Sequence, residues 1–157
     1  MRVITALVVA LGLSGLTLQT GENDYSVQNQ WGGASASWNQ GGSWVIGGRI
    51  TQRVINVDAI SYDRGNSLVG TMQYQGEGPI GFKAQRTDGD SWNVQIQFGG
   101  ASAPWNQEGV WTIGAKGVNQ PVVRLLISST DNGVNLSGFM AYKRERLIGF
   151  RAQLALI

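Results

Sequence analysis

The 157-residue chain contains no cysteine and no histidine. The missing cysteines exclude disulfides, thiolate nucleophiles and metal sites built on thiolates. The missing histidines exclude most zinc sites, serine–histidine hydrolases and acid–base catalysis by imidazole. Prolines number only three, and the formal net charge is only +2, so overall charge gives no support to a nucleic-acid partner. We therefore expect no metal and no other cofactor.

Glycine and aromatic residues are abundant instead. The chain holds 23 glycines, six tryptophans, four tyrosines and four phenylalanines. This composition is typical of a compact chain with many tight turns and not of a disordered one. At this length, one domain with a sizeable core is favoured over two half-size domains.

Residues 1–21 differ from the rest of the chain. Arg2 precedes a largely apolar stretch at 3–13, and polar residues follow. This is the layout of a secretory signal peptide, cleaved between Ser14 and Gly21. The apolar stretch is too short for a transmembrane helix, which needs about 20 apolar residues. The interpretation predicts a secreted or extracellular protein without stable membrane insertion, and the alternative is an N-terminal strand or a buried helix.

The remaining chain carries the same pattern twice. Residues 31–47 read WGGASASWNQGGSWVIG and return at 98–114 as FGGASAPWNQEGVWTIG. A second pair, 68–85 and 136–153, matches after one inserted residue in the second copy. Such an internal repeat sets the architecture, and it predicts that any binding site occurs in two related versions.

The duplication divides the domain, residues 22–157, into repeats at 25–86 and 92–154. Each repeat holds five short stretches rich in β-branched and aromatic residues and bounded by turn residues. They lie at 25–31, 43–49, 54–61, 68–75 and 80–86, then near 91–98, 110–116, 122–129, 136–142 and 147–154. Closure of ten antiparallel strands removes exposed edges, so an all-β barrel is favoured. A sandwich of two five-stranded sheets is the alternative.

Two aromatic–glycine–glycine segments are candidate binding loops. Trp31-Gly32-Gly33 and Phe98-Gly99-Gly100 each end a strand and open a glycine-rich connection. An aromatic face beside residues without side chains suits a sugar, whose C–H face stacks on the ring while backbone amides reach its hydroxyls. The alternative is that both aromatics belong to the core. The remaining tryptophans of these segments are assigned to packing at the barrel ends: Trp38, Trp44, Trp105 and Trp111.

A glutamate recurs in both copies. Residues 76–81 match the dinucleotide pattern Gly-x-Gly-x-x-Gly, but they lie between two strands with no helix after them, so that function is rejected. The glutamates Glu77 and Glu145, with Arg49 and Lys116, offer an acceptor and a donor for vicinal hydroxyls. The alternative is a surface salt bridge worth under about 1 kcal/mol. A glycosidase pair is disfavoured because equivalent positions of two repeats should lie on opposite sides of a barrel.

These motifs resemble a known family. The segment 29–39, its second copy, and the sequence GEGPIGF at 76–82 are similar to the Oscillatoria agardhii agglutinin homologues, which are high-mannose-binding lectins. The similarity runs from Tyr25 to about Leu154, and the chain is identified as a divergent member. The resemblance implies a ten-stranded antiparallel barrel of two repeats, a non-catalytic lectin, and high-mannose glycans on glycoproteins as partners.

The resemblance also implies that each sugar site joins the aromatic loop of one repeat to the basic residue and glutamate of the other. The first site would comprise Trp31, Gly32, Gly33, Lys116, Glu145 and Arg146. The second site would comprise Phe98, Gly99, Gly100, Arg49, Glu77 and Gly78. Lysine lacks the planar fork of arginine, and Arg146 fills space where the family has glycine, so we expect a weakened first site and a retained second one.

Two other functions remain open. In the first of these, the barrel is a structural or cell-surface adhesion module whose sugar binding has decayed. In the other, Lys116, Lys143, Arg144 and Arg146 cluster near the first site and favour anionic glycans. A monomer is favoured as the oligomeric state, and Asn135 begins a sequon for N-glycosylation.

Overall fold

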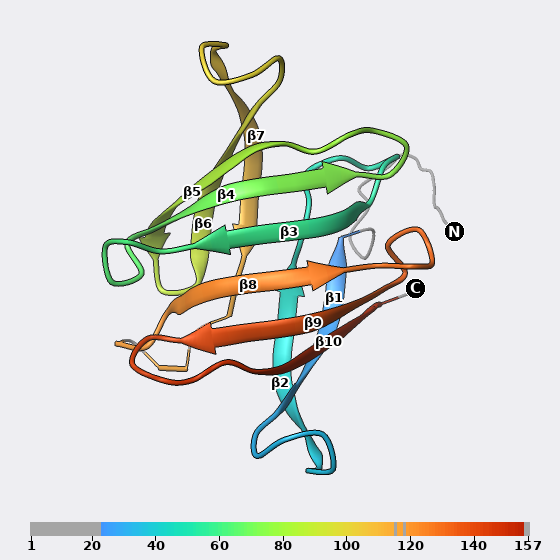
Figure 1. Ribbon diagram of the computed structural model, residues 1–157, viewed down its shortest axis with the longest axis vertical. Helices are drawn as coiled ribbons and strands as arrows, with labels where there is room; N and C mark the ends of the chain where they lie inside the picture. Colours follow the sequence, from blue (N-terminus) through green and yellow to red (C-terminus); the bar gives the residue numbers. More distant parts are fainter. Residues whose placement is uncertain (1–22, 115, 118, 156–157) are drawn as a thin grey trace.

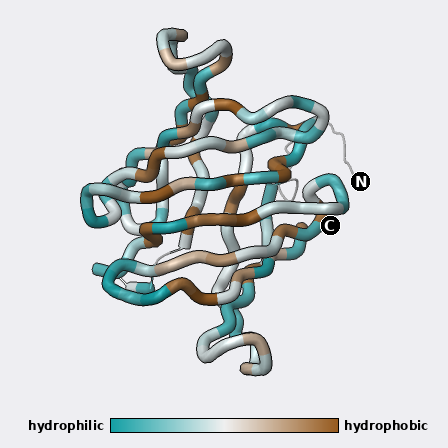
Figure 2. The backbone as a smooth tube through the Cα atoms, in the orientation of Figure 1, coloured by the Kyte–Doolittle hydropathy of each residue, from teal (hydrophilic) through white to brown (hydrophobic). Residues whose placement is uncertain are grey.

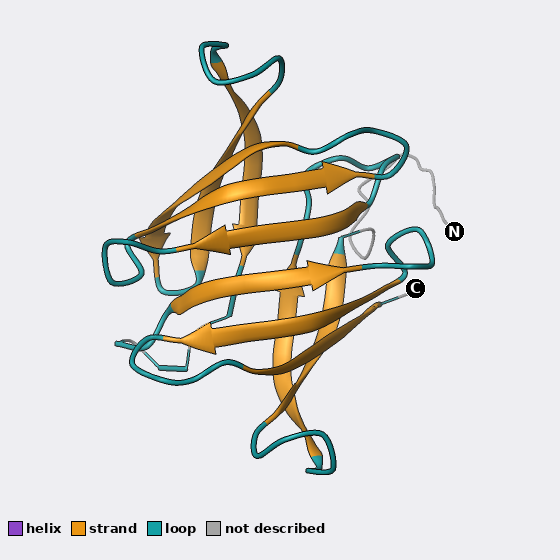
Figure 3. Ribbon diagram, in the orientation of Figure 1, coloured by secondary structure: helices purple, strands orange, loops and turns teal. Residues whose placement is uncertain are grey.

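The computed structural model describes residues 23–114, 116–117 and 119–155. The predicted signal peptide, residues 1–21, lies outside this part of the chain. The described residues form strands and loops only (Figure 3), so they include no helix of the length and apolarity that a membrane span requires.

Ten strands follow one another along the chain. They are β1 (Asp24–Gln30), β2 (Trp38–Val45), β3 (Val54–Ile60), β4 (Ser67–Tyr74), β5 (Ile80–Asp88), β6 (Ser91–Gln97), β7 (Trp105–Thr112), β8 (Val122–Ser128), β9 (Asn135–Tyr142) and β10 (Ile148–Leu154).

The strands close into an antiparallel barrel in the order β1-β10-β9-β8-β3-β4-β5-β6-β7-β2. This confirms the predicted barrel and excludes the sandwich. The first strand of each repeat pairs with the last strand of the other: β1 with β10, and β6 with β5. Each aromatic loop, at the end of β1 or β6, is therefore held beside the strands of the opposite repeat.

Two long connections project from opposite ends of the barrel (Figure 1). One joins β1 to β2 and carries Trp31, and the other joins β6 to β7 and carries Phe98. The β4–β5 and β9–β10 connections, which carry Glu77 and Glu145, also lie on opposite sides of the molecule (Figure 1). The two glutamates therefore do not flank one bond, as a glycosidase pair would.

The interior is filled by one face of every strand. In β1 and β6, for example, every second side chain is buried, and Figure 2 shows apolar and polar residues interspersed along the strands. Tilted aromatic pairs form part of the core: the ring centroids are 5.1 Å apart for Trp44 and Phe150, and 5.3 Å apart for Phe82 and Trp111. Burial of such large rings contributes most of the hydrophobic stabilisation of a small barrel.

The second strand of each repeat begins earlier in the chain than the sequence predicts. The predicted ranges are 43–49 and 110–116, whereas β2 starts at Trp38 and β7 at Trp105. The glycines at 41–42 look like a turn, but they lie in β2 at a bulge opposite β1. A Cβ on Gly41 would come 2.4 Å from Asn29 Oδ1, so β2 needs glycine to pass this buried amide.

The four tryptophans assigned to structure fall into two classes. Trp44 and Trp111 are buried in the core. Trp38 and Trp105 are half-buried on the outer wall, where each lies beneath a cation, Arg151 in one case and Lys83 in the other. They pack against the barrel wall but not within it, because the strand positions they occupy face outward.

Candidate functional site

The two aromatic loops have the same backbone. Gly32 and Gly33 have φ angles of 90° and 100°, and Gly99 and Gly100 have 87° and 101°. Side chains with a Cβ resist this left-handed region, which explains the paired glycines. Almost no neighbouring atom crowds these positions, so their backbone stays accessible.

A glutamine at the end of the preceding strand fixes each loop. Gln30 Nε2 donates to the carbonyls of Ala34 at 3.1 Å and Ala36 at 2.8 Å. Gln97 Nε2 makes the same pair of bonds to Ala101 and Ala103, at 3.2 and 2.8 Å. One side chain therefore fixes the conformation of each loop, and the binding platform beside the aromatic residue is formed before a ligand arrives.

Neither aromatic belongs to the core. Trp31 is 36 % exposed and Phe98 is 39 % exposed, in contrast to the fully buried aromatics of the barrel. A half-exposed ring beside accessible backbone amides is the arrangement expected of a binding platform.

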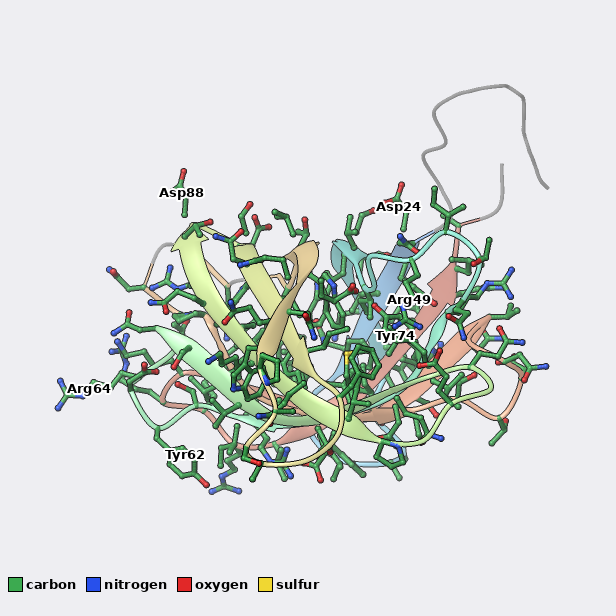
Figure 4. The ribbon with its side chains drawn as sticks, turned by 90° about the horizontal axis from the view of Figure 1, so that it is seen from above. Asp24, Arg49, Tyr62, Arg64, Tyr74 and Asp88 are labelled. Atoms are coloured by element: carbon green, nitrogen blue, oxygen red, sulfur yellow. The ribbon has the colours of Figure 1, made fainter. Side chains whose placement is uncertain are left out.

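The second site gathers residues from both repeats as predicted. The Arg49 guanidinium lies 5.7 Å from the Phe98 ring centroid and 4.0 Å from that of Tyr74. Its Nη1 donates to Glu77 Oε2 at 2.8 Å and to Gln52 Oε1 at 2.6 Å. Figure 4 shows Arg49 next to Tyr74. The cation is therefore held by an aromatic face and two acceptors.

The first site repeats this arrangement with lysine. Lys116 Nζ lies 5.4 Å from the Trp31 ring centroid and 5.9 Å from that of Tyr142. It donates to Glu145 Oε2 at 2.5 Å, and Gln120 Nε2 donates to the same oxygen at 2.9 Å. Compared with Arg49, the ammonium lies farther from its tyrosine, so the cation–π contact is weaker.

Both glutamates are held in the ionised form. Hydrogen bonds from Gln52 and then Arg49 lower the pKa of Glu77 below its usual value. For Glu145 the pKa is lowered by hydrogen bonds from Lys116 first, then Gln120, with a smaller contribution from Trp31. Because both carboxylates remain partly exposed to solvent, these ion pairs orient their groups more than they stabilise the fold.

The β9–β10 connection has two arginines where the first repeat has glycines, and the two positions differ in backbone strain. A Cβ added at Gly78 would meet no atom within 4 Å, and the φ of Gly78 is not left-handed, so its counterpart Arg146 is accommodated and exposed. Gly76 has a φ of 80°, and its counterpart Arg144 keeps this conformation with a φ of 69°. Strain therefore falls on Arg144 and not on Arg146.

The predicted basic cluster at the first site is divided in the structure. Lys116 is engaged by Glu145, whereas Lys143 and Arg144 line a groove with Ser61, Tyr62 and Arg64. This groove adjoins the connection that carries Glu145.

Sequence analysis missed two glutamines and the role of two tyrosines. Gln52 and Gln120 each brace a site glutamate and also bond a backbone carbonyl of the same connection. The available signal was their recurrence shortly after the basic residue, hidden by the inserted residue in the second copy. Tyr74 and Tyr142 were recognised only as strand residues, although their rings lie beneath the site cations.

The OAA-family lectin sugar binding domain matches this chain twice, at residues 23–87 and 90–155. Lectin OAA from Planktothrix agardhii is 49 % identical over 127 residues, which cover 81 % of this chain and 96 % of the relative. Lectin SfL-1 from Solieria filiformis is 52 % identical over 133 residues, or 85 % of this chain and 49 % of the relative. The chain thus spans about half the length of several curated relatives.

A solved structure has the same fold. The Myxococcus xanthus hemagglutinin, crystallised in complex with α3,α6-mannopentaose, is 47 % identical and superposes with a TM-score of 0.81 over 83 % of this chain and 48 % of that one. The relatives are named as lectins, in agreement with the prediction that the chain is not an enzyme. With both repeats matched and the barrel in common, the chain belongs to the OAA family of lectin sugar-binding domains.

Proposed function

We propose that this chain binds high-mannose glycans at two sites, each shared between the repeats. The observation that carries the proposal is the pairing of an exposed aromatic from one repeat with a cation–glutamate pair from the other, in both halves of the barrel. An aromatic face for the C–H side of a sugar and a charged donor–acceptor pair for its hydroxyls are complementary to mannose. The mannopentaose bound by the Myxococcus relative supports this choice of ligand.

The two sites are proposed to differ in affinity. The second site pairs Phe98 with Arg49, whose guanidinium is held at three points. The first site has the larger ring of Trp31 but a lysine, which offers one charged contact point in place of a planar fork. We expect the second site to be the stronger one because its cation is pre-organised.

An NMR titration with α3,α6-mannopentaose tests both points. The backbone amides of Gly32 and Gly33 report the first site, and those of Gly99 and Gly100 report the second. We expect the amide signals of both pairs to shift, and those of Gly99 and Gly100 to reach half of their shift at the lower mannopentaose concentration. If neither pair shifts in folded protein, mannose binding by this chain is refuted.

A companion experiment uses single substitutions. Phe98→Ala or Glu77→Ala should remove the shifts at Gly99 and Gly100 while leaving those at Gly32 and Gly33 unchanged. Unchanged binding at Gly99 and Gly100 in both variants would mean that the second site is misassigned.

A further inference from the structure

A basic groove lies apart from the two aromatic loops. It is lined by Ser61, Tyr62, Arg64, Val123, Lys143 and Arg144. Three of these residues are cationic, and none of the six is acidic. Figure 4 shows Tyr62 and Arg64 projecting outward at the same edge of the molecule.

The turn that presents Tyr62 and Arg64 is fixed from within. Ser61 Oγ donates to Asp63 Oδ1 at 2.9 Å and accepts from the Gly65 amide at 2.7 Å. Asp63 also accepts two bonds from Ser67, at 2.8 and 2.7 Å. The Asp63 carboxylate is therefore engaged by hydroxyls and an amide of its own turn, and it is not among the residues that line the groove.

Pro121 fixes the two walls of the groove to one another. A Cβ on Gly65 would come 2.3 Å from Pro121 Cγ, so the turn packs directly on this proline. The carbonyl of Pro121 accepts a bond from the Lys143 amide at 2.9 Å, and that of Val123 accepts one from the Ser61 amide at 2.9 Å. The groove is thus bounded by fixed backbone on both sides.

An exposed aromatic completes the groove. Tyr62 is 83 % exposed, the highest value among the exposed large apolar and aromatic side chains of the described residues. Arg64 and Arg144 both hold left-handed backbone conformations, with φ of 63° and 69°, which residues other than glycine resist. Two strained arginines beside an unburied ring are unfavourable for the fold alone.

The other half of the barrel lacks these features. At the corresponding positions the sequence has Thr130 for Tyr62, Asn132 for Arg64, Gln75 for Lys143 and Gly76 for Arg144. The corresponding turn has the same serine–aspartate hydrogen bonds, between Ser129 and Asp131. Because the fold forms with neutral residues there, the barrel itself does not require the cations or the ring.

We propose that this groove binds an acidic saccharide, a sulfated or carboxylated glycan, independently of the two aromatic loops. The Tyr62 ring stacks on the C–H face of a sugar unit, and Arg64, Lys143 and Arg144 contact its anionic substituents. A saccharide fits better than a duplex because only three cations line the groove and the net charge of the chain is only +2.

The test measures binding of a heparin-derived hexasaccharide to the full chain by calorimetry. The triple variant Arg64→Asn, Lys143→Gln and Arg144→Gly gives each position the residue of the other repeat. We expect the triple variant to bind about tenfold more weakly, since each exposed charge pair is worth about 0.5 kcal/mol. Raising NaCl from about 50 to about 300 mM should weaken wild-type binding.

Three controls make the outcome decisive. Lys83→Gln removes a cation outside the groove and should leave hexasaccharide binding unchanged; an equal loss there would mean that general charge, and not this groove, binds the probe. Tyr62→Ala should weaken binding at unchanged fold, and unchanged binding would refute the stacking contact. A single-stranded DNA hexamer should compete poorly, and equal competition would refute preference for a saccharide.

A separate readout distinguishes this proposal from mannose binding. The triple variant should keep the mannopentaose shifts at Gly99 and Gly100, whose site shares no residue with the connection that carries Lys143, Arg144 and Glu145. If the triple substitution does not affect hexasaccharide binding, the proposal that this groove binds an acidic saccharide is refuted, and the proposed mannose sites are not affected by that result. If the wild-type chain binds the hexasaccharide but not mannopentaose, the proposed function is contradicted and the groove stays in place.

Discussion

Arg49 of the first repeat and Phe98 of the second are site neighbours, with 5.7 Å between the guanidinium carbon and the ring centroid. The contact exists because β6, which leads into Phe98, pairs with β5 of the first repeat. Each repeat therefore contributes half of each site. A single repeat cannot form either one, and a substitution of the cation or glutamate of one repeat changes the site that holds the aromatic of the other.

Phe98→Trp is expected to tighten mannopentaose binding at the second site several-fold. Tryptophan offers a larger face for a sugar and a stronger partner for Arg49. The thermal midpoint should change little because Phe98 is exposed. The amides of Gly99 and Gly100 give the site-specific midpoint in an NMR titration. Weaker binding would mean that the phenyl ring is not the sugar platform.

Lys116→Arg is expected to tighten the first site by roughly threefold to tenfold. Arginine supplies a planar fork that engages Glu145 and leaves further donors for a ligand. The measurement is the titration midpoint at Gly32 and Gly33, with Gly99 and Gly100 as the internal control. Lys116→Ala should instead weaken the same site. If the arginine variant and the alanine variant behave alike, this cation has no part in binding.

Glu108 of β7 braces the second site from behind. Its carboxylate accepts hydrogen bonds from the Tyr74 hydroxyl, from the Gly48 amide at 2.5 Å and from the Trp111 indole at 3.2 Å. The Tyr74 ring lies beneath Arg49, and Gly48 directly precedes Arg49 in the chain. One carboxylate thus positions both the ring and the backbone that hold the cation.

In the part of the chain that the structure describes, no carboxylate braces the first site in this way. The position of Glu108 is occupied by Gly41 in the first repeat, and among the described residues the indole nitrogen of Trp44, which corresponds to Trp111, has no hydrogen-bond partner. Glu108→Gly is therefore expected to weaken the second site about tenfold, as the loss of hydrogen bonds to a charged group predicts.

The midpoints at Gly99 and Gly100 measure that effect. Glu108→Gln keeps one acceptor, so its affinity for mannopentaose at the second site should lie between those of the wild type and the glycine variant. A merely structural role would lower the thermal midpoint and affect both sites equally, so unequal midpoints at unchanged fold are the distinguishing result.

Arg144→Gly is expected to stabilise the barrel by about 1 kcal/mol. Its left-handed φ of 69° costs a residue with a Cβ more than it costs glycine. The thermal midpoint should rise by about 3 °C for a domain of this size. Gly76→Ala, at the corresponding position, should lower it by a similar amount. A fall in the midpoint of Arg144→Gly would mean that the arginine makes a stabilising contact.

Sequence reasoning located the repeats and the strands other than β2 and β7, and it grouped each loop aromatic with the cation that lies near it in the structure. The repeat identified corresponding residues, and the family resemblance supplied the exchange between repeats. Gln52, Glu108 and the basic groove were not predicted from the sequence, because each depends on segments that meet only in the closed barrel. Sequence reasoning misplaced β2 because the role of Gly41 depends on Asn29 of the neighbouring strand, and local glycine content cannot show this.

The pH dependence of mannopentaose binding follows from the two site glutamates. Hydrogen bonds lower the pKa of both Glu77 and Glu145 below the usual value of 4.5. A carboxyl group with a lowered pKa in the folded state keeps its interactions above the unfolded value and loses them as the pH falls through the lowered one. The chain has no histidine, so no side chain with an ordinary pKa titrates between about pH 5 and 8.

Binding at both sites should therefore be constant from about pH 7 to about pH 5 and decrease only below about pH 4.5, as protonation removes the acceptors. Calorimetric titrations at stepped pH measure this profile. Glu77→Gln should weaken the second site already at neutral pH and make its residual affinity independent of pH, because the neutral amide cannot titrate. A decline that begins between about pH 7 and 5 would show that a group other than these two carboxylates controls binding.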